Sequence, residues 1–348
     1  MFVYIISAFF TLGLLWISTN SVELKNRNKL SAIVCGFPLF MIAAIRQGIG
    51  TDYYTYIEML ELYFSHGFRG KVEPGFFWLN VFIDYFFENP QWLFVVCSAM
   101  IVFLIFYYVL ESSINPVFSI YLYITLTFYL SSFNTMRQHI ACAICLIALV
   151  FLNKKSYLKF FVLVGIAVLF HYTAIIFFSV YVLAKIKIKP RLATVIIIIT
   201  YVLSPIIGNI ANTLMSKSIY ALYANLEGER TISIASYLGI AVQLAILFLG
   251  YLYINFNDEK NRLYFNIQLI STCITVLGSF IPLVSRVKWY FALSEIVYIP
   301  MVISNINDRY RKRIISMGCV ACFAVYYWVV IKVTGSYGVL PYKSIIEW

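Results

Sequence analysis

The sequence contains little charge. Only 12% of its 348 residues are charged, whereas 62% are hydrophobic and 18% are aromatic. Because about a quarter of the residues in a soluble globular domain are charged, this composition excludes an ordinary soluble protein. Uncharged runs of about 18 residues or more recur along the whole chain, and each is long enough for a helix to cross the hydrocarbon core of a bilayer. We therefore expect an all-α, polytopic integral membrane protein with a single transmembrane domain over residues 1–348.

Patterns typical of metal sites and disulfides are also scarce. The chain has three histidines and no Asp-x-Asp motif, and its seven cysteines all lie in apolar runs. Cys142 and Cys145, like Cys319 and Cys322, have Cys-x-x-Cys spacing, but on a membrane helix this spacing only places two small apolar side chains on one face. We therefore expect neither disulfides, nor a bound metal, nor any other cofactor.

Basic residues outnumber acidic ones, 26 to 15, and they indicate the orientation. Lys and Arg accumulate in cytoplasmic loops, and the dense basic clusters of this chain are all cytoplasmic only if two apolar segments do not cross as single helices. The positive charge therefore reflects orientation and needs no nucleic-acid partner. About 10 transmembrane helices are expected, over residues 2–19, 30–45, 92–110, 116–133, 140–152, 192–210, 234–256, 263–284, a shorter span with Glu295 and Pro300, and 314–331.

The two exceptional segments lie near residues 76–87 and 160–184. The first offers only twelve residues and contains Asp84, so it is too short and too polar to span, and we expect a re-entrant or interfacial helix. The second is uncharged, carries His171 near its middle and has basic residues on both sides. One tilted helix or a broken hairpin of two half-helices would fit its length. The hairpin keeps both basic clusters in the cytoplasm and places His171 at its outer tip.

On this map the isolated polar residues gather at the outer membrane boundary, where residues 46–75 and 211–233 form extracytoplasmic loops. The stretch Arg46-Gln-Gly-Ile-Gly-Thr-Asp52 puts opposite charges beside the apolar slab, where an unpaired charge is costly. It is either a connector with a local ion pair or part of a ligand site. Several arginines near the lipid headgroups suit a phosphate or diphosphate lipid that carries sugars, because arginine binds phosphate bidentately and stays charged when partly buried.

Candidate site residues follow from this grouping. The expected base for transfer to a hydroxyl is Asp52 or His171, with Glu73 third, because partial desolvation moves the pKa of a carboxylate or imidazole toward neutrality. Plainer roles stay open: aromatic residues populate membrane interfaces, arginines at helix ends snorkel, and a lone histidine is often a buried structural residue. The expected substrate-binding residues are Arg46, Tyr53, Tyr56, Asn134, Arg137, Gln138, Arg286 and Tyr290.

The order of these residues resembles the signature of a known family. The pieces are Arg46-Gln-Gly-Ile-Gly-Thr-Asp52-Tyr53 with Tyr56, Glu73-Pro-Gly, Asn134-x-x-Arg137-Gln138, Phe170-His171 and Ser285-Arg286-x-x-x-Tyr290. From about residue 40 to about residue 300 this order is similar to the EpsG family of bacterial polysaccharide polymerases, which is related to the Wzy O-antigen polymerases. The resemblance implies extension of an O-antigen of lipopolysaccharide, a capsule or an exopolysaccharide on undecaprenyl diphosphate at the outer face of the bacterial inner membrane.

Together with the grouped arginines and candidate bases, this resemblance implies a metal-independent membrane glycosyltransferase that joins undecaprenyl-diphosphate-linked repeat units, one as donor and one as acceptor. Departure of the diphosphate builds negative charge, which Arg46, Arg137 and Arg286 would neutralise. A chain-length regulator protein is a further implied partner. One alternative is a flippase or exporter of lipid-linked oligosaccharide, which would tend to show internal repeats and a transverse polar path. Another is an O-antigen ligase or single-sugar glycosyltransferase, whose site would use the same chemistry.

Overall fold

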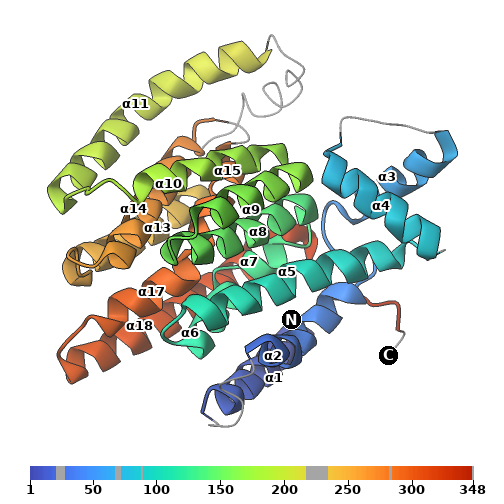
Figure 1. The fold of residues 1–348 in the computed structure, drawn as a ribbon, viewed down its shortest axis with the longest axis horizontal. Coiled ribbons are helices and arrows are strands. Elements are labelled where there is room, and N and C mark those ends of the chain that lie inside the picture. The colour runs from blue at the N-terminus through green and yellow to red at the C-terminus, as the bar shows by residue number, and fades with distance from the viewer. Residues whose placement is uncertain (21–27, 67–71, 88, 217–233, 282–283, 347–348) are drawn as a thin grey trace. The chain divides into compact units, whose positions relative to one another are not determined.

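The computed structural model describes residues 1–20, 28–66, 72–87, 89–216, 234–281 and 284–346 (Figure 1). The regular structure of these ranges is helical, and one isolated β-bridge joins Arg46 to Ser344. The all-α prediction is confirmed. Among the described residues, six helices are long and apolar enough to cross a membrane: Phe2–Asn20, Gln91–Ser112, Met136–Asn153, Pro190–Thr213, Ser236–Tyr253 and Arg309–Val333. The expected total of about ten spans is not confirmed by this count.

The chain forms two compact units. The first comprises Met1–Ile176 and Arg313–Trp348, and the second comprises Phe177–Lys312. The helices of the first unit are α1 (Phe2–Asn20), α2 (Asn28–Ala44), α3 (Tyr53–His66), α4 (Pro74–Phe86), α5 (Gln91–Ser112), α6 (Pro116–Thr125), α7 (Phe128–Ser131), α8 (Met136–Asn153), α9 (Tyr157–Phe170), most of η1 (Tyr172–Phe178), most of α18 (Arg309–Trp328), η2 (Val329–Val333) and η3 (Ser336–Gly338). The interval 46–75, which is predicted to be extracytoplasmic, contains α3.

Helix α8 lies inside the first unit. It packs against α5 and α9, while α2 packs against α1 and α5, and α4 packs against α9. Almost every side chain of α8 is buried, which agrees with a helix that is hydrophobic all round apart from its first turn. That first turn carries Arg137, so the packing of α8 determines where this arginine lies.

The expected span 116–133 is broken, which corrects the sequence map. Helix α6 ends at Thr125, and Thr127 has a left-handed backbone with φ of 65° before the single turn of α7 begins. Such a conformation is unfavourable for a β-branched residue, and the hydroxyl groups of Thr127 and Tyr337 lie 3.2 Å apart in a hydrogen bond that helps to hold it. The sequence gives no sign of this break, because the segment is apolar throughout. The hydroxyl that supports the break belongs to Tyr337, 210 positions away along the chain.

The two segments that were not expected to cross as single helices, near residues 76–87 and 160–184, begin with short helices. Helix α4 has 13 residues, and α9 has 14 residues and ends at Phe170. His171 then has an extended backbone, with φ of −157° and ψ of 118°, and the 3-10 helix η1 follows. The predicted break at His171 is confirmed, whereas the position of either segment in a bilayer stays a prediction.

The second unit is arranged around α14 (Glu259–Leu277). Its other helices are α10 (Ser179–Leu183), α11 (Pro190–Ser216), α13 (Ile234–Tyr253), α15 (Val284–Val287), α16 (Trp289–Ala292) and α17 (Glu295–Ser304). Helices α10, α11, α13, α15, α16 and α17 all contact α14. The side-chain amide of Asn266 in α14 donates to the carbonyls of Leu183 and Ile186, which satisfies acceptors that the end of α10 leaves open. Of the expected loop 211–233, residues 217–233 lie outside the described residues.

Candidate functional site

The start of α4 lies unusually close to the end of α9. A Cβ atom on Gly75 would lie 2.8 Å from the carbonyl oxygen of Leu169 and 3.0 Å from its carbonyl carbon. Since real Cβ contacts are longer, only glycine allows the two backbones to approach so closely. Pro74 fits the first turn of α4, where a missing N–H costs little. The Glu73-Pro-Gly sequence therefore brings Glu73 to the end of α9, where His171 lies.

Glu73 joins Arg137 and His171 in what we call the Glu73 cluster. Its side chain makes no capping hydrogen bond to α4. Instead, Nη1 of Arg137 donates to its Oε2 at 2.7 Å, and Nδ1 of His171 lies 3.7 Å from its Oε1. The same nitrogen of His171 makes a hydrogen bond of 3.0 Å with the hydroxyl of Thr173, and the tautomer of the ring decides which atom donates. The cluster thus combines a carboxylate, a guanidinium and an imidazole.

The three members differ in exposure. The side chain of Glu73 is 7% exposed, whereas those of Arg137 and His171 are 27% and 23% exposed. The helix dipole disfavours a positive charge in the first turn of a helix, where Arg137 lies in α8. The negative charge of Glu73 offsets this unfavourable interaction. The guanidinium also lies 5.7 Å from the centre of the Phe76 ring. Glu73 is therefore a buried anchor, and the arginine and histidine are the accessible members of the cluster.

Arg46, expected to contact substrate, is buried next to the start of α8. It is 1% exposed, and its guanidinium carbon lies 4.3 Å from the ring centre of Phe133 and 5.0 Å from that of Phe94. Its Nη2 donates to the carbonyl of Phe133 at 3.1 Å. Burial lowers the pKa of Arg46 to about 10, so it is still charged at neutral pH. In the described residues it forms no ion pair with Asp52. Arg46 is therefore buried rather than at the surface, and its contact with substrate stays a prediction.

The loop that follows Arg46 is held by Asn134, two residues before α8, and by the C-terminal segment. Gly50 has φ of 101°, and a Cβ atom there would lie 2.6 Å from Oδ1 of Asn134. That oxygen accepts a hydrogen bond from the backbone of Thr51 at 3.0 Å, and the amide nitrogen of Asn134 donates to the carbonyl of Tyr337. Asn134 therefore joins two segments of backbone, and its polar atoms are used within the protein.

The C-terminal segment was not singled out in the sequence. The backbone of Gly50 donates to Gly338, that of Gln47 donates to Lys343, and that of Ile345 donates to Ile45. These bonds run alongside the motif that begins at Arg46. No local pattern in the tail indicates this pairing, because a single bridge leaves no alternation of polar and apolar residues.

The remaining candidates of the first unit have structural contacts. Tyr53 stacks on Phe94 with ring centres 4.3 Å apart. Tyr56 is 5% exposed, and burial raises its pKa to about 12, so its hydroxyl stays neutral. Gln138 is 2% exposed in α8. Asp52 precedes α3 and accepts a hydrogen bond from the hydroxyl of Thr51 at 2.8 Å. No hydrogen bond or ion pair of the described residues links Asp52 to the Glu73 cluster.

Two candidates belong to the second unit. Arg286 in α15 is exposed, and Tyr290 in α16 is fully buried. The ring of Tyr290 is buried, and its contact with substrate stays a prediction. The exposed guanidinium of Arg286 remains a predicted ligand for phosphate.

A buried polar network in the second unit was also not expected. Gln268 donates to Gln243 at 2.9 Å, and Gln243 donates to Glu295 at 2.7 Å, which links α14, α13 and α17. The hydroxyl of Ser271 donates to Glu295 as well. A polar side chain inside an apolar helix can be recognised in the sequence as a candidate buried or functional residue. Gln243 and Gln268 are two such residues.

Comparison with known proteins gives one result. A family model described as the EpsG family matches residues 29–344, which is nearly the whole chain. No curated protein and no solved structure matches. The family is of the polysaccharide-polymerase type, and its membrane character agrees with the apolar helices described above. The chain is therefore a multi-pass membrane protein that belongs to the EpsG family.

Proposed function

We propose that this protein is a polysaccharide polymerase of the bacterial inner membrane, with its active site on the outer side. It transfers a growing glycan from undecaprenyl diphosphate to a hydroxyl of the next lipid-linked repeat unit. The bond between the anomeric carbon and the phosphate oxygen breaks, and a bond from that carbon to the acceptor oxygen forms. The acceptor proton moves to a base on the protein, and undecaprenyl diphosphate leaves.

The Glu73 cluster is the observation that carries this proposal. Arg137 is accessible and has a planar fork of donors, so it suits the diphosphate whose charge increases as it leaves. His171 is accessible and has an imidazole ring, so it suits the removal of the acceptor proton. Glu73 would orient both and stabilise the imidazolium that forms, as a buried carboxylate does beside a catalytic histidine.

The other candidates take supporting roles in this scheme. Asp52 is the alternative base, since it is partly exposed at the start of α3. Arg286, in the second unit, is proposed to bind a phosphate group of the lipid-linked substrate. Arg46 and Asn134 would shape the loop beside the site, and Tyr53 would hold that loop to α5. The reaction is proposed to need no metal, because arginines supply the positive charge.

The glycan of a deletion strain tests the reaction class. A strain without the gene should carry single repeat units on its surface lipid and no longer chains, and the wild-type gene should restore the ladder of lengths. A strain with no surface repeat units at all would instead indicate a flippase. Full-length chains retained on undecaprenyl diphosphate would indicate a ligase.

A further inference from the structure

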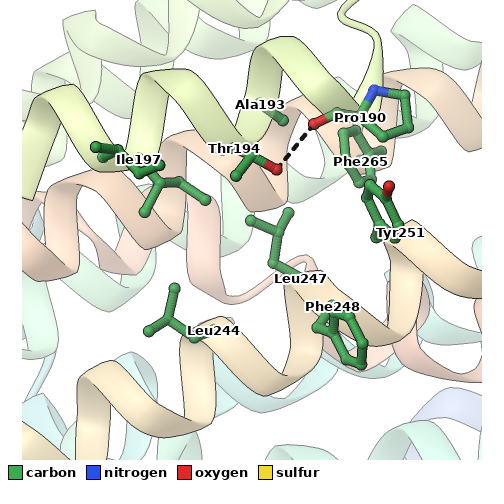
Figure 2. Close-up of a pocket in the computed structure, with 10 residues that line it drawn as sticks. Pro190, Ala193, Thr194, Ile197, Leu244, Leu247, Phe248, Tyr251 and Phe265 are labelled. Atoms are coloured by element: carbon green, nitrogen blue, oxygen red, sulfur yellow. Dashed lines mark hydrogen bonds between the residues drawn. The ribbon is translucent and has the colours of Figure 1, made fainter.

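The second unit contains an apolar groove that takes no part in the proposed reaction. It lies between α11 and α13 (Figure 2). Its volume of about 460 Å³ is within the range of ligand sites in proteins. It is lined by Pro190, Ala193, Thr194, Ile197, Ile198, Leu244, Leu247, Phe248, Tyr251 and Phe265.

The walls of the groove suit hydrocarbon. Aliphatic and aromatic side chains face each other from the two helices, as Figure 2 shows for Ile197 and Leu247. The hydroxyl of Thr194 donates to the carbonyl of Pro190 at 3.2 Å, so this polar atom is used within α11. Helices α11 and α13 are both long and apolar enough to cross a membrane. In that setting an acyl chain is the ligand that such walls would hold.

One end of the groove is strongly basic. Pro190 and Phe265 lie in the lining, and the adjoining residues 185–191 and 258–262 carry six basic and two acidic side chains. Lys187, Lys189 and Arg191 are exposed, and no carboxylate in the described part of the chain pairs with them. Of the two acids, Asp258 accepts a hydrogen bond from the backbone of Asn261. The groove therefore offers apolar walls and an excess of positive charge at one end.

We propose that this groove binds an anionic phospholipid of the cytoplasmic leaflet. The phosphate would lie beside Lys187, Lys189 and Arg191, and an acyl chain would lie between α11 and α13. Two observations select this ligand. The positive charge at one end of the groove favours an anionic headgroup. An excess of Lys and Arg is expected on the cytoplasmic side of the membrane, so the lipid would come from that leaflet. The lipid-linked glycan has its diphosphate on the outer side in the proposed reaction, so it is not the expected occupant.

Native mass spectrometry of the detergent-purified full-length protein tests this proposal. Phosphatidylglycerol, phosphatidylcholine with the same acyl chains, and a polyprenyl phosphate are each titrated. We expect saturable binding of one phosphatidylglycerol, with an affinity about tenfold or more above that for phosphatidylcholine. Equal binding of the two phospholipids would refute the role of the basic end, and preference for the polyprenyl phosphate would refute the phospholipid assignment.

Three variants locate the site. Thr194→Trp fills the groove and should abolish the preference for phosphatidylglycerol. Ile199→Trp is the matched control, because Ile199 is exposed on the same helix but does not line the groove, and it should bind as the wild type does. Combined Lys187→Gln, Lys189→Gln and Arg191→Gln should reduce phosphatidylglycerol binding about tenfold or more and leave phosphatidylcholine unchanged. Wild-type preference in Thr194→Trp would place the lipid elsewhere and overturn the proposal.

Discussion

Arg137 and Arg46 lie in opposite environments, and this difference determines whether a substitution should affect mainly activity or mainly stability. Arg137 is partly exposed and pairs with Glu73, whereas Arg46 is enclosed by Phe94 and Phe133. Arginine and lysine differ in the planar fork of donors rather than in charge. A change that keeps the charge therefore separates a role in binding from a role in anchoring.

Arg137→Lys should reduce chain extension per molecule by about 100-fold, the usual loss when one donor to a developing negative charge is removed. Its abundance in the membrane should change little, because lysine still neutralises Glu73. The measurement is glycan length and amount, normalised to the protein in the membrane. Wild-type chain lengths in this variant would show that Arg137 only anchors α8.

Arg46→Ala should instead lower stability. It removes a large buried side chain and leaves the carbonyl of Phe133 without its donor, at a cost of about 2 to 5 kcal/mol. Arg46→Met should cost less, because methionine fills much of the volume and no buried charge has to be desolvated. Thermal unfolding in detergent should rank the wild type above Arg46→Met and Arg46→Ala last. Equal stability with lost activity in both variants would return Arg46 to the substrate site.

Sequence reasoning identified the members of the Glu73 cluster but not the direction in which Arg46 points. Polar residues beside or within an apolar run indicate a boundary or a break, so Glu73, Arg137 and His171 were recognisable. Whether an arginine at such a boundary faces solvent or the core depends on rings far along the chain; Phe133 is 87 positions from Arg46. No local pattern carries that information.

At the scale of the element, the approach of α4 to α9 positions the cluster. Gly75→Ala places a methyl group against the backbone of Leu169, and backbone atoms cannot rotate away as a side chain does. The start of α4 must therefore shift, which separates Glu73 from His171. We expect chain extension per molecule to fall about tenfold or more.

Gly165→Ala is the control for this prediction. Gly165 lies in α9 itself, and a Cβ atom there would meet nothing within 4 Å. Alanine favours helix by about 1 kcal/mol over glycine, so activity should be unchanged. Equal activity of both alanine variants would show that the close approach of the helices does not matter for the reaction.

Of the two helix breaks, at His171 and Thr127, only the first could be predicted from the sequence. The break at His171 was predictable because basic residues on both sides conflict with one continuous span. The break at Thr127 was not, since residues on both sides are apolar and the hydroxyl of Tyr337 that helps to hold it comes from the other end of the chain. Charge constrains topology along the sequence, whereas tertiary contacts can end a helix without leaving a pattern.

At the scale of the whole molecule, sidedness is the prediction on which the reaction depends. In a variant without native cysteines, a cysteine at Thr51 should react with an impermeant thiol reagent in intact spheroplasts, and a cysteine at Arg311 should react only after lysis. Both native residues are exposed, so accessibility is not limited by the fold. The reverse pattern would place the Glu73 cluster in the cytoplasm and contradict a polymerase that acts outside.

The most direct test of the account is the length of glycan made per molecule by His171→Ala and His171→Gln. If His171 accepts the acceptor proton beside Glu73, both variants should be present in the membrane at nearly wild-type levels and should yield single repeat units, because glutamine fills the space of the ring but takes up no proton. A full ladder of chain lengths from both variants, normalised to protein in the membrane, would contradict the central claim that the Glu73 cluster carries the transfer.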